Sequence, residues 1–193
     1  MKRKIKVLVA SILLLSMTAV SYAQPYKGGV GLVVGNLYGV QGKLFLTPKL
    51  ALQADLAWKL GTYPSNYHLH LSYYISDFEL NPNLLYQSNI AEWGWGQLDW
   101  FVGGGLSFGC AFVSWDYNRY HYISGHYFGS AAAGKLGVNA IGGVELSLSK
   151  VPLAFAVDLR PGYGLVFRDW GISYFDWGVT ASVRYCFGQT KGK

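Results

Sequence analysis

The pentapeptide Gly105-Leu106-Ser107-Phe108-Gly109 has the G-x-S-x-G spacing with which many hydrolases present a nucleophilic serine. That spacing works only at a sharp strand-to-helix turn, where the serine hydroxyl is exposed. Here apolar residues alternate with small ones on both sides of Ser107, which predicts a continuous strand instead. We therefore interpret Ser107 as a structural residue that faces the inside of the fold.

A second glycine motif, over residues 129–135, has the G-x-x-x-x-G-K spacing of a phosphate-binding loop. The position after Lys135 should hold a serine or threonine for Mg²⁺, but it holds Leu136. The strand before the motif and the helix after it are not predicted either. We reject nucleotide binding for this segment.

Two histidines two positions apart, His68 and His70, would face the same way on a strand and could hold a metal ion. No third ligand is evident, and we interpret both as residues of a loop surface or rim. A hydrolase acting on lipid could be assembled from four side chains in one polar segment, although no spacing rule supports it. Those four are Asp116, His121, Ser124 and His126. The sequence thus predicts no catalytic residue, no metal site and no cofactor.

In the segments that would position these side chains, apolar and other residues alternate with a period of two. After residue 24, apolar residues recur at every second position, which is typical of strands with one apolar face. The clearest segments are 29–36, 40–46, 50–59, 98–108, 136–148, 153–160 and 175–187. A weaker strand within 78–89 contains Pro82, and the neighbouring segment 67–75 is either the real fourth strand or an extension of it. These segments predict eight strands.

The predicted connections alternate in length. Residues 47–49 and 149–152 are tight turns, whereas 61–77 and 113–134 are long loops rich in tyrosine, histidine and asparagine. Short turns at one end and long loops at the other are typical of an outer-membrane barrel. We predict an all-β fold, an eight-stranded antiparallel up-and-down transmembrane β-barrel, with both termini on the periplasmic side.

The apolar face of these strands carries large side chains that suit contact with lipid. The other face has too few charged residues to form the solvent-exposed surface of a water-soluble barrel of the lipocalin type. We predict a lumen with four positive and four negative charges, which are Lys43, Lys59, Arg160, Arg184, Asp55, Asp99, Glu145 and Asp158. Two interpretations stay open, an ion-selective pore and a salt-bridged plug. We favour the plug, because small barrels are filled by side chains and balanced charges can pair inside.

Aromatic residues are expected in two girdles at the headgroup levels. The tryptophans near the loop-side rim are Trp58, Trp115, Trp170 and Trp177, and those near the turn-side rim are Trp93, Trp95 and Trp100. The two cysteines lie on opposite faces and near opposite ends of the barrel. Because a disulfide needs Cα atoms within about 7 Å, we predict that Cys110 and Cys186 are free thiols.

One long loop is the best candidate for contact with an external partner, because it is rich in tyrosine and arginine, which are good contact residues at interfaces. Its candidate residues are Trp115, Tyr117, Arg119, Tyr120, His121, Tyr122, His126 and Tyr127. An ordered loop lying at the lipopolysaccharide headgroups is the alternative.

Composition and charge agree with a membrane location. The chain of 193 residues is 51% apolar and 13% charged, against about 25% charged in ordinary soluble domains. Residues 1–23 combine a basic start, an apolar run and Ser21-Tyr22-Ala23, which predicts a cleaved signal peptide. Four of the 16 basic residues lie there, so residues 24–193 have 12 basic and 10 acidic residues, a net charge of +2. No basic stripe indicates a nucleic-acid partner.

Several segments resemble the small bacterial outer-membrane β-barrel proteins, a porin-like family with an eight-stranded barrel domain. They are residues 39–46 with their tight turn, 100–109 with three consecutive glycines, 142–145 and 152–158, and the closing Val183-Arg184-Tyr185-Cys186-Phe187. The resemblance implies residence in the Gram-negative cell envelope and insertion by the outer-membrane assembly machinery. The usual insertion signal is a final aromatic strand ending in phenylalanine, whereas here residues 188–193 follow Phe187 as a short tail.

The resulting organisation is a signal peptide over 1–23, an outer-membrane β-barrel over 24–187 and a tail over 188–193. We expect an integral membrane protein in contact with lipid and lipopolysaccharide. Its expected role is structural or a surface interaction carried by external loops, without catalysis. The alternatives are a lipid-modifying enzyme and a narrow channel for small solutes, because one fold hosts many functions.

Overall fold

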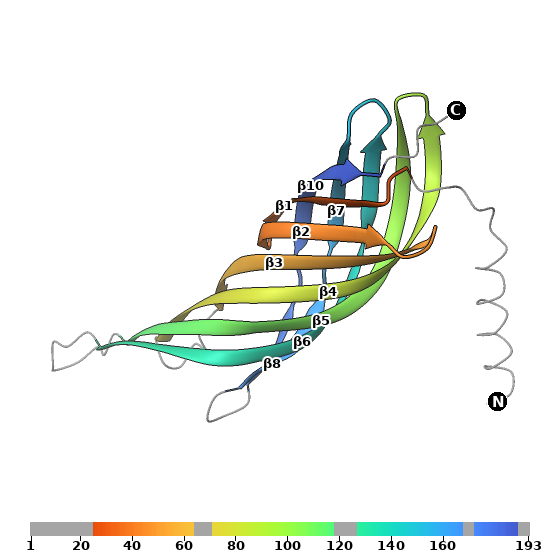
Figure 1. Cartoon of the computed structure of the whole chain (residues 1–193). Coiled ribbons are helices and arrows are strands. Elements are labelled where there is room, and N and C mark those ends of the chain that lie inside the picture. The colour runs from red at the N-terminus through yellow and green to blue at the C-terminus, as the bar shows by residue number, and fades with distance from the viewer. Residues whose placement is uncertain (1–24, 64–70, 118–126, 168–171, 189–193) are drawn as a thin grey trace, which may run out of the picture.

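The structure is a computed structural model that describes residues 25–63, 71–117, 127–167 and 172–188. All regular elements in these residues are strands, which pair antiparallel in one sheet (Figure 1). They are β1 (Gly28–Gly35), β2 (Tyr38–Phe45), β3 (Leu50–Tyr63), β4 (Leu71–Trp93), β5 (Gly96–Tyr117), β6 (Tyr127–Leu148), β7 (Leu153–Leu159), β8 (Gly162–Phe167), β9 (Ile172–Asp176) and β10 (Val179–Phe187). The prediction of an all-β antiparallel fold is confirmed. No helix among the described residues is long and apolar enough to cross a membrane.

The sheet closes on itself. Each strand from β1 to β7 pairs with the next, β7 pairs with β10, and β10 pairs with β1, so eight strands form a ring. Two short strands, β8 and β9, continue the lines of β7 and β10 after brief interruptions. Reciprocal backbone hydrogen bonds between Arg160 and Gly178, of 2.9 and 3.3 Å, join the two lines at the interruption. The predicted number of eight strands is confirmed for the ring, but the single last strand predicted over 175–187 is divided into β9 and β10.

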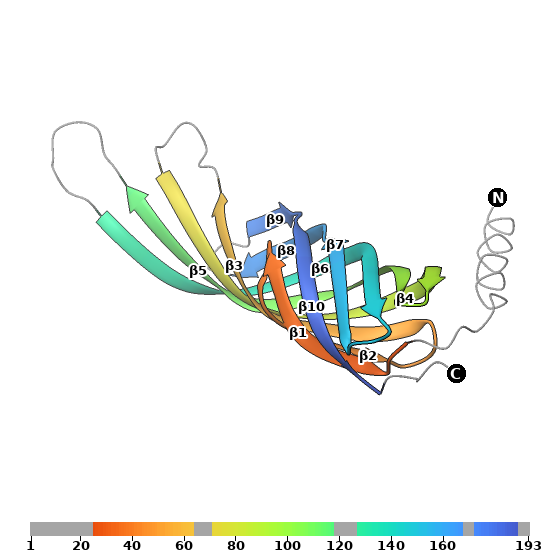
Figure 2. The same ribbon diagram turned by 90° about the horizontal axis from the view of Figure 1, so that it is seen from above.

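Two of the predicted long loops are mostly strand. β3 and β4 remain paired out to Tyr63 and Tyr73, and β5 and β6 remain paired out to Tyr117 and Tyr127. Figures 1 and 2 show these hairpins extending far beyond β1 and β2. The loop predictions over 61–77 and 113–134 were therefore too long, because polar alternation near a hairpin tip resembles loop composition.

The fourth strand, β4, runs through Pro82 and reaches from the 71–75 part of the predicted extension to Trp93. Pro82 pairs with Ala54 of β3, whereas the regular pairing with β5 is interrupted at residues 81–82. This placement suits a residue without a backbone N–H group. A second irregularity, between Asn89 and Ala91, shifts the register of β4 against β5.

The ring is complete only near one end. We call the end with the short connections after β2, β4 and β6 the turn end, and the opposite end the loop end. β1 and β2 are joined already at residues 36–37, and the last pair between β2 and β3 is Tyr38 with Trp58. Beyond it, β3 pairs with β4 and β9 pairs with β8 in the described sheet. The wall therefore lacks two strands between β9 and the Lys59–Tyr63 part of β3, and we call this break the notch.

Side chains divide cleanly between the two faces of the ring. Of the described residues, 38 large hydrophobic side chains are exposed, among them Leu32, Val102 and Phe155. Twenty-one polar or charged residues are buried, including Gln87, Asp99 and Glu145, which are completely buried. A small apolar cluster of Leu85, Phe101 and Ile141 with two alanines fills part of the interior. The fold therefore has a polar inside and an apolar outside, the reverse of an ordinary globular protein.

Glycines allow neighbouring strands to approach closely. A Cβ atom added at Gly31 would lie 2.6 Å from the Cα of Arg184, and one at Gly105 would lie 2.8 Å from the Cα of Asn83. Both distances are too short for any side chain, so the interior of this narrow ring requires glycine at these positions.

Candidate functional site

The lumen at the turn end is organised around Glu145 of β6. Its Oε2 accepts a 2.7 Å hydrogen bond from Nζ of Lys43 and forms an ion pair with Arg184. Its Oε1 accepts a 2.5 Å hydrogen bond from the hydroxyl of Tyr26. Alternation places Lys43 and Arg184 on the inner face of β2 and β10, which flank β1. β2 lies opposite β6 in the ring, whereas β10 is separated from β6 by β7. One buried carboxylate thus neutralises part of the charge of two cations.

Tyr26 precedes the first strand and is only 2% exposed. Burial, reinforced by the negative charge of Glu145, holds the pKa of its phenol well above the ordinary value. Tyr26 is therefore a neutral hydrogen-bond donor inside the turn end of the ring.

Asp99 of β5 is the exception among the predicted lumen charges. Its carboxylate accepts hydrogen bonds from the amide groups of Gln97 at 2.7 Å, Gln87 at 2.9 Å and Asn89 at 3.2 Å. No cation contacts it among the described residues. Three amide donors, rather than an ion pair, compensate for its burial.

The middle of the lumen is held by Arg160, which lies where β7 gives way to β8. Its guanidinium reaches Oδ2 of Asp55 at 2.6 Å and Oδ1 of Asp158 at 2.5 Å. Gln41 links this level to the turn end, because its amide nitrogen donates to Asp55 at 2.7 Å while its oxygen accepts from Arg184. The two levels therefore form one connected network across the ring.

A third level lies nearer the loop end. Lys135 of β6 forms ion pairs with Asp77 and Glu79 of β4, and its Nζ lies 4.4 Å from the ring centre of Tyr174 in β9. Lys59 of β3 forms an ion pair with Asp176 of β9, and this pair crosses the notch.

The structure places all eight predicted lumen charges inside the ring, and seven of them form ion pairs. Sequence reasoning did not include Asp77, Glu79, Lys135 and Asp176 in the lumen. It assigned Asp77 to a loop and Lys135 to another motif, whereas Glu79 and Asp176 lay in predicted strands and were left out of the charge list. The same alternation could have found them, since Lys135 shares the parity of Glu145 and Asp77 shares that of Asn81.

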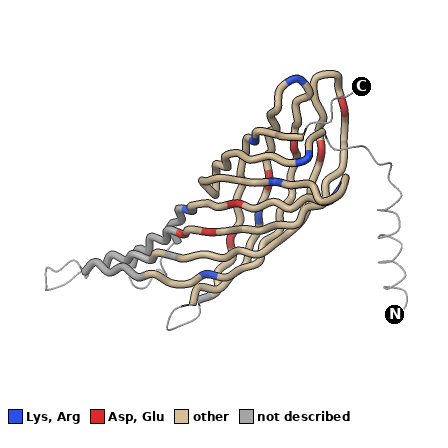
Figure 3. Tube along the Cα trace, viewed as in Figure 1, with Lys and Arg blue, Asp and Glu red and all other residues tan. Residues whose placement is uncertain are grey.

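The predicted charge balance of the lumen is wrong. With the four added residues, five cations face seven carboxylates among the lumen side chains that the structure describes, an excess of two negative charges. The charged positions are spread singly over many strands rather than gathered in one run (Figure 3). The described interior of the ring is therefore lined by ion pairs and carries a net negative charge.

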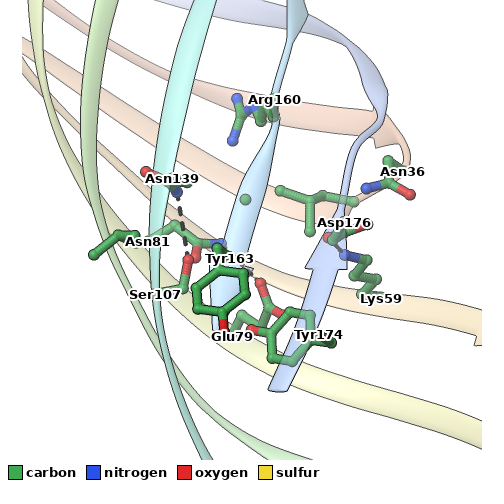
Figure 4. A pocket seen from close by; sticks show the side chains of 13 residues that line it. Asn36, Lys59, Glu79, Asn81, Ser107, Asn139, Arg160, Tyr163, Tyr174 and Asp176 are labelled. Carbon is green, nitrogen blue, oxygen red and sulfur yellow. Dashed lines mark hydrogen bonds and ion pairs between the residues drawn. The ribbon is translucent and has the colours of Figure 1, made fainter. Parts of the chain in front are cut away.

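A cavity of about 30 Å³ lies between the middle level and the level nearest the loop end (Figure 4). Asn81, Ser107 and Asn139 lie together on one side of it, and Lys59 and Asp176 lie on the other. The amide nitrogen of Asn139 donates to the hydroxyl of Ser107 at 3.4 Å, whereas the amide oxygens of Asn81 and Asn139 have no hydrogen-bond partner. The cavity wall is mostly polar, and two of its residues have a buried amide oxygen without a partner.

The two glycine motifs lie within strands. Ser107 is a buried residue in the middle of β5, and its hydroxyl belongs to the cavity wall rather than to a strand-to-helix turn. Lys135 belongs to β6, where carboxylates hold it. Among the described residues, no group of three or more His, Cys, Asp or Glu side chains could hold a metal ion.

Five of the tryptophans that we assigned to the girdles are exposed on the outer face or at the turns, namely Trp58, Trp93, Trp95, Trp100 and Trp177. Trp93 and Trp95 stack at the turn end with their ring centres 5.5 Å apart, and Trp58 stacks on Phe112 on the side toward the loop end at 6.0 Å. Cys110 is exposed, Cys186 is buried, and both are free.

Several predicted residues lie outside the described part of the chain. These are the signal peptide, His68, His70, Trp170, Ser124 of the hypothetical hydrolase set, and Arg119, Tyr120, His121, Tyr122 and His126 of the predicted contact loop. Trp115, Asp116, Tyr117 and Tyr127 have described backbone in β5 and β6, but their side chains are not described.

No family model, no curated protein and no solved structure matches this chain. The functional argument therefore depends on the geometry of the ring and its lumen.

Proposed function

We propose that this protein is an integral β-barrel of the bacterial outer membrane, exported by a cleaved signal peptide, with a structural or surface-interaction role. The observation that carries the proposal is the inverted distribution of side chains. A belt of exposed leucine, valine, phenylalanine and tryptophan surrounds a lumen of buried ion pairs. Water would penalise such an outer surface, whereas hydrocarbon favours it.

Ring closure supports the same location. In hydrocarbon every backbone N–H and C=O group must find a partner within the protein, so only helices and closed sheets can span a bilayer. The turn-end half of this sheet has no free edge, because β1 pairs with both β2 and β10. The strands there have 7 to 9 residues in β1, β2, β7 and β10 before the ring opens. That length is slightly below the 9–11 residues of a typical crossing strand, so we place the notch near the outer headgroup level.

The filled lumen favours a structural or interaction role over a channel. Three levels of ion pairs and the cluster around Phe101 occupy the interior, and the described cavity holds only about 30 Å³. Any surface interaction would use the ends of the long β3–β4 and β5–β6 hairpins, which extend furthest from the turn end.

Fractionation and gel migration test the proposal. The protein expressed with its native leader should occur in the outer-membrane fraction, resist extraction at high pH and require detergent for solubility. The unheated protein should migrate faster on a gel than the boiled protein, because a closed sheet resists the detergent until heated. A protein that stays soluble without detergent and migrates identically in both samples would refute the membrane assignment.

A further inference from the structure

The cavity lies beside the notch. Its wall includes Asn36 and Leu37 from the β1–β2 turn, Lys59 from β3 and Asp176 from β9, which are the elements that border the break. Neighbouring strands of a sheet lie about 4.8 Å apart. A gap of two missing strands therefore corresponds to about 14 Å between β9 and β3 at the notch. The Lys59–Asp176 ion pair crosses this space, and the Asp176 side chain remains 22% exposed. A molecule can therefore approach the cavity from the side after displacing one ion pair.

The chemistry around the cavity favours a cation. Near it, Glu79 and Asp77 share Lys135, Asp176 is held by Lys59, and Arg160 is shared by two carboxylates. Among the described residues, five carboxylates thus face three cations at the middle and loop-end levels. An anion would have to displace carboxylates from each of these cations. A cation would instead be attracted by the excess of negative charge around the cavity.

Two residues of the cavity wall carry an amide oxygen that has no hydrogen-bond partner among the described residues. The amide oxygen of Asn81, a residue that is 1% exposed, has no partner, and neither does the amide oxygen of Asn139. Buried polar atoms are rarely left unpaired without a ligand or water to satisfy them. A primary ammonium group carries three donors and no acceptor, which matches this arrangement.

The size of the cavity limits the ligand to a small headgroup. A water molecule needs about 10–15 Å³ of such space, so a cavity of about 30 Å³ holds an ammonium group and its first methylene. The remainder of the ligand would extend through the notch, past Trp177 of the exposed outer surface.

We propose that this cavity binds the primary ammonium group of an amphiphile or a free alkylamine, which enters sideways through the notch. The ammonium group of Lys59 already occupies the entrance, where it forms an ion pair with Asp176. The ammonium group of the ligand displaces this ion pair when it enters. The ammonium group then passes Asp176 and binds beside Asn81 and Asn139, whose amide oxygens accept its hydrogen bonds. An aminated lipid headgroup is one source of this group, and that source depends on the membrane location proposed above. A free amine is the other source.

The first experiment titrates the folded protein in dodecyl maltoside, which contains no amine. The probe is butylammonium, and the readout is the side-chain amide signals of the ¹⁵N-asparagine-labelled protein. We expect saturable shifts of the Asn81 and Asn139 signals with a dissociation constant of about 1 mM. Butyltrimethylammonium has the same charge but no N–H donor, and it should not produce these shifts.

Two asparagines on the same strand provide a matched pair of variants. Asn81 and Asn83 are both 1% exposed and both have an unpartnered amide oxygen, but only Asn81 lines the cavity. Asn81→Leu should weaken butylammonium binding about tenfold, which corresponds to one charge-assisted hydrogen bond. Asn83→Leu removes a 2.9 Å hydrogen bond from the Asn83 amide nitrogen to the backbone oxygen of Asn81 but changes no residue of the cavity wall, so it should leave binding within about twofold of the unaltered protein. Lys59→Met should tighten binding about fivefold or more, because the internal competitor for Asp176 is removed. Heat-dependent gel migration verifies that each variant is folded.

A second arm separates the two sources. In nanodiscs, phosphatidylethanolamine should weaken the apparent binding of butylammonium relative to phosphatidylcholine, which has the same net charge but no N–H donor, if a lipid headgroup occupies the site. Equal binding in both lipids would assign the site to free amines.

The proposal is overturned if folded protein binds neither probe, if both probes shift the same signals, or if the Asn81 and Asn83 variants behave alike. The titration in micelles does not require a membrane location. Binding by a protein absent from the outer membrane would therefore refute the proposed function and retain the site.

Discussion

The hydroxyl of Tyr26, two residues before the first strand, donates a 2.5 Å hydrogen bond to the carboxylate of Glu145 in β6. The Tyr26 ring packs edge-on against Phe45 with ring centres 5.2 Å apart. The segment before β1 therefore closes the turn end of the lumen and ties residues that are 119 positions apart in the chain.

Replacing Tyr26 by phenylalanine removes this hydrogen bond and keeps the aromatic packing. The variant should lower the free energy of unfolding by about 1.5–3 kcal/mol, the value of a hydrogen bond to a charged group. Urea unfolding of the protein in detergent micelles measures the difference. Tyr38→Phe serves as the control, because Tyr38 is 52% exposed on the outer face. Equal effects of the two substitutions would contradict the assigned role of Tyr26.

Replacing Glu145 by glutamine leaves Lys43 and Arg184 without their shared carboxylate. Removing one partner of a buried ion pair costs about 3–5 kcal/mol, because the remaining charges stay buried. Glu92→Gln at the exposed turn end should change stability by less than about 0.5 kcal/mol. The same unfolding measurement compares the two variants, and a loss below 1 kcal/mol for Glu145→Gln would show that the network is not a stabilising plug.

A charge on the outer face tests the lipid belt. Val183 lies in the middle of β10 and points outward, so Val183→Lys should destabilise the protein in lipid vesicles by about 2–4 kcal/mol. Val151→Lys, at the turn between β6 and β7, should cost at most about 1 kcal/mol because it lies at the interface. If the two substitutions cost the same in vesicles, Val183 does not face hydrocarbon.

The filled lumen predicts very low ion conductance. Because three levels of ion pairs cross the described interior, we expect no continuous water path along the ring. In planar bilayers the purified protein should produce no steady current steps, whereas a wide porin inserted in the same bilayer gives them. Regular cation-selective steps from this protein would instead favour the channel alternative, and the acidic excess of the lumen would set their selectivity.

Alternation along the strands was enough to place Lys43, Asp55 and Glu145 on the inner face, because a strand has a period of two whatever its neighbours are. The same rule failed for Asp77 and Lys135. Their segments contain tyrosine, serine and glycine, which occur equally in long hairpins and in loops, and local composition does not distinguish the two.

The sequence also could not predict which charged side chains pair with each other inside the lumen. Arg160 contacts Asp55 from 105 positions away and Asp158 from two positions away, whereas Asp99 contacts amide groups. Which charges meet depends on the stagger between neighbouring strands, and that stagger is a property of the closed ring.

By itself, the sequence determined the strand faces, the number of strands in the ring and the expectation of a membrane location, since all three follow from local periodicity and composition. Only the tertiary structure decided that Lys59 and Asp176 meet across a break in the wall, and that a cavity lies beside them. The break exists because the β1–β2 connection is short while β3, β4, β5 and β6 continue. The sequence shows that these strands differ in length, but only the pairing of the strands in the closed ring shows that this difference leaves a break in the wall.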